Sequence, residues 1–419
     1  MGLRRRAVGG LEQTVTPSSS WAESGPDGGP ARPCPVCGSV LHDVLFQQRF
    51  EHFAAGSITD AYDVVACSTC GMCFATGLPD QGRFTEYYDQ SSKYDLSAEG
   101  AELSPFDAER YADEARFLAA HVADCTRPVL DIGTATGALL VALRKMGFTS
   151  VHGVEPSGEA VRVARETHGL DVITGDAAAA RAWGAGFAVV SLVAVLEHLV
   201  NPRAALRDAA ELLSAAGILY LHVPDAARFS AHVDAPYQQF SVEHINYFTA
   251  ASLKNLLASA GFEVEVERAI VAELSADTEG SAVEVLCRRT DQRLDVRYDS
   301  DGVDALRQYI ARSADKETVV LGRIAELAED QSPIYVWGTG THALHLLATS
   351  RLAECNIVGF LDSNPHYSGR RLAGRMVMAP RDVETVDSPI LVASAVSQTA
   401  IAETARRLFG NDVPLILMY

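Results

Sequence analysis

The chain has 419 residues, enough for about two or three domains, and 48% of them are hydrophobic, as in a globular protein with sizeable cores. The formal net charge of -19 disfavours general binding to nucleic acid or to anionic membranes, because those surfaces are themselves negative. The most apolar run, residues 187–200, contains Glu197 and His198 and is too short to span a bilayer, and no export signal is visible. We therefore expect a cytoplasmic protein with reduced cysteines.

Four segments follow one another along the chain. Residues 1–30 are rich in Gly, Ser and Pro and are interpreted as a disordered tail. Residues 31–95 hold a cysteine-containing module. In residues 100–275 a helix at 106–122 precedes apolar runs at 129–131, 151–155, 188–192, 218–223 and 263–269, which alternate with helical stretches and predict a doubly wound α/β domain. In residues 276–419 a helix at 304–330 precedes strands at 334–337, 357–361, 390–393 and 415–418, which predict a second, smaller α/β domain.

The cysteine module contains two C-x-x-C pairs, Cys34/Cys37 and Cys67/Cys70, and each pair is followed by glycine. Reduced thiolates at this spacing match a tetrahedral Cys₄ zinc site, whereas a redox C-x-x-C would explain only one pair. Four protein ligands leave no position for an activated water. The spacing therefore predicts one structural zinc per chain.

A glycine-rich turn joins the first apolar run of the central domain to a helix, with Asp131, Gly133, Ala135 and Gly137 at successive odd positions. The two glycines permit turn conformations and a close approach of a ligand to the backbone. Taken alone, the turn is also compatible with a dinucleotide enzyme or with no ligand at all.

Later blocks narrow the ligand. Glu155 ends the next strand, where a carboxylate can accept hydrogen bonds from both ribose hydroxyls of a nucleoside, and Asp176 follows the third strand, where it could accept from an adenine amino group. Together with the blocks near residues 195–199, 212–224 and 260–264, this order resembles the class I S-adenosylmethionine (SAM) methyltransferase domain. The loop does not fit G-x-G-x-x-G and lacks a basic cluster, which disfavours an NAD-dependent enzyme. Ala135 stands where that family commonly has a third glycine.

The order of all three modules resembles the deoxysugar C-methyltransferases that act on nucleotide-linked 4-keto sugars in antibiotic biosynthesis. The resemblance implies a small N-terminal zinc-binding module, a central Rossmann-like methyltransferase domain and a smaller C-terminal Rossmann-like domain. It also implies that Glu243 and His244 belong to the active site, with His244 as general base and Glu243 as its orienting partner or a sugar ligand. His198 matches a further active-site histidine, interpreted as an enolate stabiliser.

The resemblance places substrate-contacting tyrosines at Tyr87 and Tyr88, although tyrosines there are also ordinary packing residues. Ser241 replaces the tyrosine that the sugar enzymes carry two residues before the glutamate. A lone histidine at position 244 would be interpreted as a residue that caps or packs beneath the following helix, and it is the pairing with Glu243 at this place in the domain that favours an active-site role. The alternatives left open are O- or N-methylation of a small molecule or sugar, and a non-catalytic zinc module that senses nucleotide.

In the C-terminal domain a strand runs into Gly338, Gly340 and His342, and Asp362 ends the next strand. The pattern is typical of a nucleotide-binding start, with Asp362 as a ribose ligand, or of a degenerate fold retained for packing. In the resembling family this domain closes over the nucleotide-sugar. We therefore expect a small-molecule substrate such as a nucleotide-sugar, no nucleic acid or membrane partner, and a monomer or homodimer.

Overall fold

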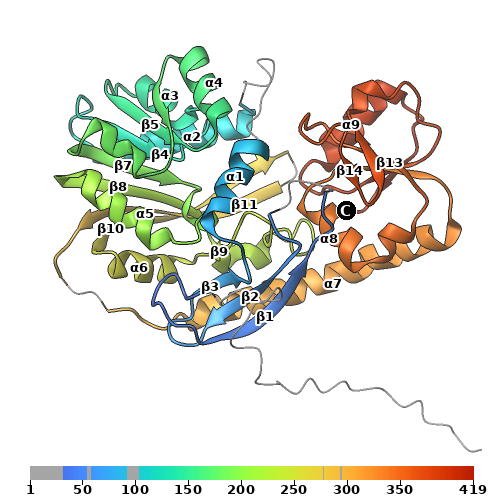
Figure 1. Ribbon diagram of the computed structural model, residues 1–419, viewed down its shortest axis with the longest axis horizontal. Coiled ribbons are helices and arrows are strands. Elements are labelled where there is room, and N and C mark those ends of the chain that lie inside the picture. The colour runs from blue at the N-terminus through green and yellow to red at the C-terminus, as the bar shows by residue number, and fades with distance from the viewer. Residues whose placement is uncertain (1–31, 54–57, 92–102, 277, 293–294) are drawn as a thin grey trace, which may run out of the picture.

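The computed structural model describes residues 32–53, 58–91, 103–276, 278–292 and 295–419, so the expected tail at 1–30 lies outside the described residues. Three sheets organise these residues. In Figure 1 the central domain (green) and the C-terminal domain (orange to red) lie on opposite sides of the N-terminal module (blue). The predicted α/β architecture is confirmed.

The central sheet has seven strands, and β4 lies in its middle. From one edge to the other the strands are β10 (Phe262–Ser275), β11 (Thr278–Arg289), β8 (Leu213–Pro224), β7 (Phe187–Val193), β4 (Val129–Ile132), β5 (Val151–Glu155) and β6 (Asp171–Thr174). Strands β8, β7, β4, β5 and β6 are parallel, whereas β11 runs antiparallel to β8 and to β10. Five of these strands, β4, β5, β7, β8 and β10, coincide with the predicted apolar runs, whereas the order of the strands in the sheet was not predicted.

Helices cover both faces of this sheet because its buried strands present apolar side chains alternately to the two sides. Val129 packs into the core formed with α2 (Pro105–His121), α3 (Ala138–Lys145) and α4 (Gly158–His168). Its neighbour Leu130 packs into the opposite core, with η2 (Ala179–Trp183), α5 (Pro202–Leu212) and α6 (Ala250–Ser259). The cysteine module packs on this second side.

Strands β10 and β11 form a long antiparallel hairpin at the edge of the sheet. The expected boundary between residues 275 and 276 falls at its turn. Strand β11, which the sequence analysis did not anticipate, inserts between β10 and β8 and completes the central sheet.

The N-terminal sheet contains β1 (His42–Arg49), β2 (Ala61–Cys67), β3 (Cys73–Thr76) and β9 (Asn246–Tyr247), and α1 (Gln81–Ser91) follows it in the chain. Strand β9 comes from the central region and pairs with β3. The segment that carries Glu243 and His244 is therefore held against the N-terminal module.

The C-terminal domain begins with the long helix α7 (Ser300–Asp330). Its sheet has the order β14 (Arg371–Leu372), β15 (Arg375–Met378), β13 (Ile357–Leu361), β12 (Ile334–Trp337), β16 (Ile390–Val392) and β17 (Leu415–Leu417). The helices α8 (Thr341–Thr349) and α9 (Gln398–Phe409), with the short η5 (Arg351–Glu354) and η6 (Pro380–Asp382), connect these strands. All four strands predicted here are confirmed.

The N-terminal module contacts the C-terminal domain directly. Phe53 stacks on Tyr367 with ring centroids 4.8 Å apart and forms an isolated bridge with Leu372. One apolar core joins these residues to α7, so the two parts share buried surface. Within the described residues, no helix is both long and apolar enough to cross a membrane.

Candidate active site and cysteine cluster

The glycine-rich turn lies at the carboxyl end of β4, in the centre of the sheet. Gly133 has a φ of 74°, and a side chain there would meet Val195 at 2.6 Å, so only glycine fits. Gly137 has a φ of 86°, and a side chain there would come even closer to Leu170. Ala135 also adopts a left-handed conformation, with a φ of 49°, which explains why the family commonly has glycine at that position.

Glu155 ends β5 and is 7% exposed. Its Oε2 accepts a hydrogen bond from Ala135 N at 2.9 Å, and its Oε1 accepts one from Ser157 N at 2.9 Å. Burial raises the pKa of this carboxyl group. Glu155 thus links the turn after β4 to the turn after β5, and each carboxylate oxygen keeps further acceptor capacity for ribose hydroxyls.

The other two predicted acids differ in their surroundings. Asp131 is buried at the end of β4, where Ser191 Oγ donates to Oδ1 at 2.7 Å, and burial raises its pKa to about 7. Asp176 is exposed, and its Oδ1 accepts from Ala178 N at 3.0 Å in the turn after β6. Gly175 N donates to Glu155 O at 3.0 Å, which brings the β5 and β6 ends together.

The five residues expected around the reacting groups come together from three segments. Tyr87 in α1 donates to Glu243 Oε1 at 3.1 Å, and the oxygen of Tyr88 lies 3.0 Å from His198 Nδ1. His198 ends η3 (Leu196–His198), and its ring centroid lies 4.8 Å from that of His244. His198 Nδ1 also lies 3.1 Å from Glu243 O, and because a carbonyl only accepts, Nδ1 carries the proton in that contact.

Ser241, which stands where the sugar enzymes carry a tyrosine, bonds to the backbone of the Glu-His pair. Its Oγ accepts from Glu243 N at 3.2 Å and from His244 N at 3.0 Å, so it fixes the backbone of the pair. The ring of Tyr237, four residues before Ser241, stacks on Phe46 with centroids 4.2 Å apart, and the residue is 5% exposed.

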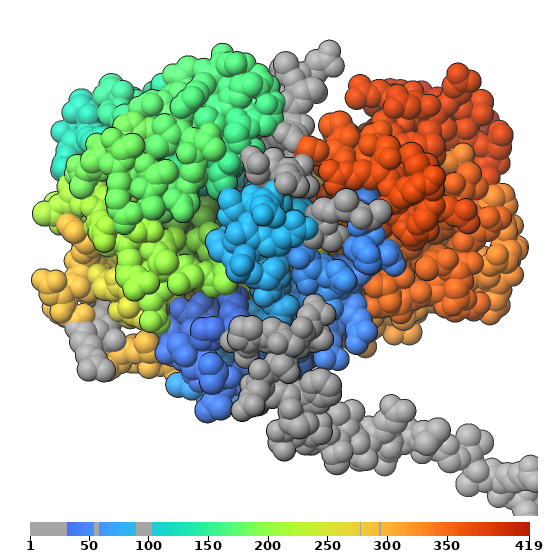
Figure 2. Space-filling view, viewed as in Figure 1, coloured from blue at the N-terminus to red at the C-terminus, as the bar shows by residue number. Residues whose placement is uncertain are grey.

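A cavity of about 530 Å³ opens between this segment and the C-terminal domain. Glu243 and His244 line one wall, and the opposite wall contains Gly338, Gly340 and His342. Figure 2 shows the central and C-terminal domains as separate lobes on either side of the N-terminal module. The cavity thus joins residues that the sequence assigns separately to the active site and to substrate contact.

The C-terminal turn repeats the arrangement around Glu155. Asp362 at the end of β13 accepts from Thr339 N at 2.8 Å through Oδ2 and from Asn364 N at 2.9 Å through Oδ1. Gly340 caps the N-terminus of α8 and has open space beside its Cα. His342 is 5% exposed and contacts the Tyr419 hydroxyl, and burial lowers its pKa to about 3, so it is neutral at pH 7.

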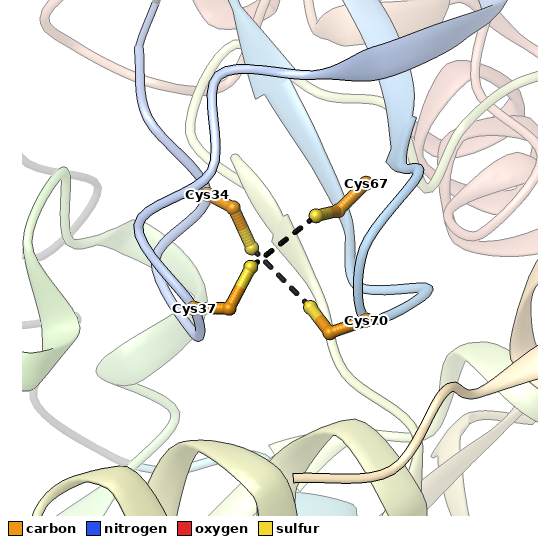
Figure 3. Close-up of side chains that lie close together, drawn as sticks. All are labelled: Cys34, Cys37, Cys67 and Cys70. Carbon is orange, nitrogen blue, oxygen red and sulfur yellow. Dashed lines mark hydrogen bonds between the residues drawn. The ribbon is translucent and has the colours of Figure 1, made fainter.

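The four predicted zinc ligands converge, as Figure 3 shows. Their sulfur atoms all lie within 4.8 Å of one another, with 3.5 Å from Cys34 to Cys70 and 3.4 Å from Cys37 to Cys67. A tetrahedral zinc with bonds of about 2.3 Å separates its sulfur ligands by about 3.8 Å. All four are free cysteines, and their placement fits this ion.

Sequence reasoning missed two residues that join these segments. The Arg32 guanidinium is buried and donates to backbone carbonyls next to both His198 and His244. Asn246 Nδ2 donates to Leu196 O at 2.8 Å. No local sequence pattern marks Arg32 or Asn246 as functional, because the residues that they bond to are distant in the sequence.

A family model covers most of the central domain. Residues 95–267 match the model of a family described as a methyltransferase domain. Among solved structures, magnesium protoporphyrin IX methyltransferase from Synechocystis PCC 6803 with bound SAM is 17% identical, with a TM-score of 0.37, over 50% of this chain and 98% of that chain. The CcbJ methyltransferase from Streptomyces caelestis is 20% identical, with a TM-score of 0.38, over 48% of this chain and 100% of that chain. A comparison with curated proteins finds no match.

The matched domain, the strand order and the carboxyl ends of β4, β5 and β6 define the class of protein. The central region is a class I methyltransferase domain, and the protein is a SAM-dependent methyltransferase.

Proposed function

We propose that the protein methylates a small molecule held in the cavity beside Glu243 and His244. The proposed acceptor is a nucleotide-linked keto-deoxysugar or a related natural-product intermediate, methylated at carbon. The single observation that carries this proposal is that the Glu-His pair, which lines the cavity, also contacts Tyr87 and His198. The proposed base and its neighbouring carboxylate thus line the cavity, and Tyr87 and His198 contact them without being among the residues that line it.

SAM, when bound over the turn at Gly133, supplies an electrophilic methyl group. Gly133 packs against Val195, three residues before His198, so the cofactor turn adjoins the proposed catalytic block. Asp131, Glu155 and Asp176 would hold the cofactor from the ends of three adjacent strands.

In the proposed reaction His244 removes a proton from the carbon next to the substrate ketone. The resulting enolate carbon bonds to the methyl group, and the electrons of the broken carbon–sulfur bond remain on sulfur, which yields S-adenosylhomocysteine. Glu243 orients His244 or binds the sugar. His198 already donates from Nδ1 to Glu243 O, so it would stabilise the enolate oxygen from Nε2 in its doubly protonated form.

The C-terminal turn supports a nucleotide as part of the acceptor. The N-terminus of α8 faces the cavity through Gly340, and helix N-termini favour phosphate groups. Asp362 is arranged as Glu155 is, at the end of a strand beside a glycine turn, where it would accept from ribose hydroxyls. We also propose that the cysteine cluster holds one structural zinc and that the protein is cytoplasmic.

The decisive experiment combines a variant with an isotope exchange. His244→Ala is expected to leave SAM affinity unchanged and to abolish turnover, because it removes the base and not the cofactor contacts. In deuterated buffer the wild-type protein should exchange the hydrogen next to the ketone, and His244→Ala should not. Turnover without any exchange would instead favour O- or N-methylation, and full activity of His244→Ala would contradict the proposal.

A further inference from the structure

Arg32 lies two residues before the first cysteine of the cluster, and the residue is only 7% exposed. Within the described residues, its guanidinium donates only to uncharged oxygens, at distances of 2.7–3.1 Å. These oxygens are Ala75 O, Leu199 O, Val200 O, Ile245 O and Asn246 Oδ1. They belong to three segments: strand β3, the residues directly after η3, and the segment that runs into β9.

Two of these segments carry the proposed catalytic histidines. Leu199 directly follows His198, and Ile245 directly follows His244. A second set of bonds ties the same segments: Asn246 Nδ2 donates to Leu199 O at 2.8 Å, and Ile245 N donates to Glu197 O at 2.8 Å. Arg32 therefore completes a network that sets the distance between the two histidines.

Holding the sheet together would not by itself require a cation at this position. Strands β3 and β9 already pair through their backbones. Burying a guanidinium carries a desolvation cost that an apolar side chain would avoid. What arginine adds is a rigid plane of five donors, which fixes several acceptors relative to one another.

We propose that Arg32 is a positioning residue for methyl transfer. It acts through the carbonyls of Leu199 and Ile245 to hold His198 and His244 at a fixed distance from each other. Arg32 N also donates to Thr76 Oγ1 at 3.1 Å, so the cysteine module fixes the backbone from which the side chain reaches inward. This gives the N-terminal module a part in the reaction although none of its cysteines lines the cavity. The proposal rests on the proposed function.

The test uses Arg32→Met, which keeps an unbranched side chain and removes every donor. The matched control is Arg162→Met, since Arg162 pairs with Glu159 and Glu166 of its own helix α4, near the surface. Arg32→Met is expected to lower kcat by about 10- to 100-fold, because small misplacements of reacting groups have effects of this size, while metal content and SAM affinity stay unchanged. Arg32→Lys should recover part of the rate, and the control should behave as the wild type.

The imidazole NMR signals of His198 and His244 test the positioning without any acceptor. They should shift in Arg32→Met and not in Arg162→Met. If Arg32→Met does not fold, Arg32→Lys replaces it, because lysine keeps the positive charge but lacks the rigid plane of five donors, and the signals of both histidines should again shift relative to the wild type. Unchanged histidine signals, or a rate loss matched by equal losses of SAM affinity and melting temperature, would overturn the proposal. Shifted signals with no methylation in any variant would instead count against the proposed function.

Discussion

Removal of the Glu155 carboxylate is expected to weaken SAM binding strongly. The residue is buried, and its two oxygens already accept from Ala135 N and Ser157 N, which holds the carboxylate in place before the cofactor binds. A hydrogen bond to a charged group contributes about 1.5–3 kcal/mol. Loss of two such bonds to the ribose, partly replaced by water, should cost about 3 kcal/mol, or roughly a 150-fold increase in Kd.

Isothermal titration with SAM measures this change directly. Glu155→Ala should show the full loss of SAM affinity. Glu155→Gln should show an intermediate loss, because the amide nitrogen of the new side chain would face one of the two backbone N–H donors. The control is Glu159→Ala, which removes an exposed acid from the neighbouring helix and should bind as the wild type does. Unchanged affinity in a folded Glu155→Ala protein would refute the assignment of the β5 end to the cofactor.

Three further changes test other parts of the account. Burial raises the pKa of Asp131 to about 7, so the cationic cofactor should bind more tightly as pH rises from about 6 to 8, and its binding should release a proton. In the free protein the same group should lower the free energy of unfolding as pH rises from about 4 to 7. Calorimetry in two buffers checks the proton release, melting at several pH values checks the stability, and Asp131→Asn should remove both effects. Elemental analysis should return about one zinc per chain, lost in Cys34→Ser and kept in Cys73→Ser, and a metal-replete Cys34→Ser protein would contradict the Cys₄ site. Gly340→Glu should weaken binding of a nucleoside diphosphate by charge repulsion at the α8 N-terminus, whereas Gly340→Ala should not, and equal affinities would argue against a nucleotide there.

The sequence predicted the central sheet well because its strands are short apolar runs bounded by glycine and acidic residues. Strand β5 and the position of Glu155 at its end agree with the prediction. Strand β11 was missed, because a strand that inserts between two others is identified by its partners and not by its own pattern. The four cysteines were found from spacing alone, since each pair is local.

The proposed catalytic residues were found by family resemblance, but the way they are held could not be predicted. In the sequence, Ser241 was noticed only because the resembling family has a tyrosine at that position. In the structure it fixes the backbone of Glu243 and His244. The contacts of Arg32 with residues more than 160 positions away depend on the tertiary fold. The same holds for the cavity, whose walls come from two domains.

The most direct test of the account supplies SAM with a carbon-13-labelled methyl group to the protein together with a panel of nucleotide-linked 4-keto sugars. The account predicts release of S-adenosylhomocysteine and an NMR signal for the labelled methyl on the carbon next to the ketone. A labelled methyl on oxygen or nitrogen would contradict C-methylation, and no S-adenosylhomocysteine with any acceptor would contradict the proposed substrate class.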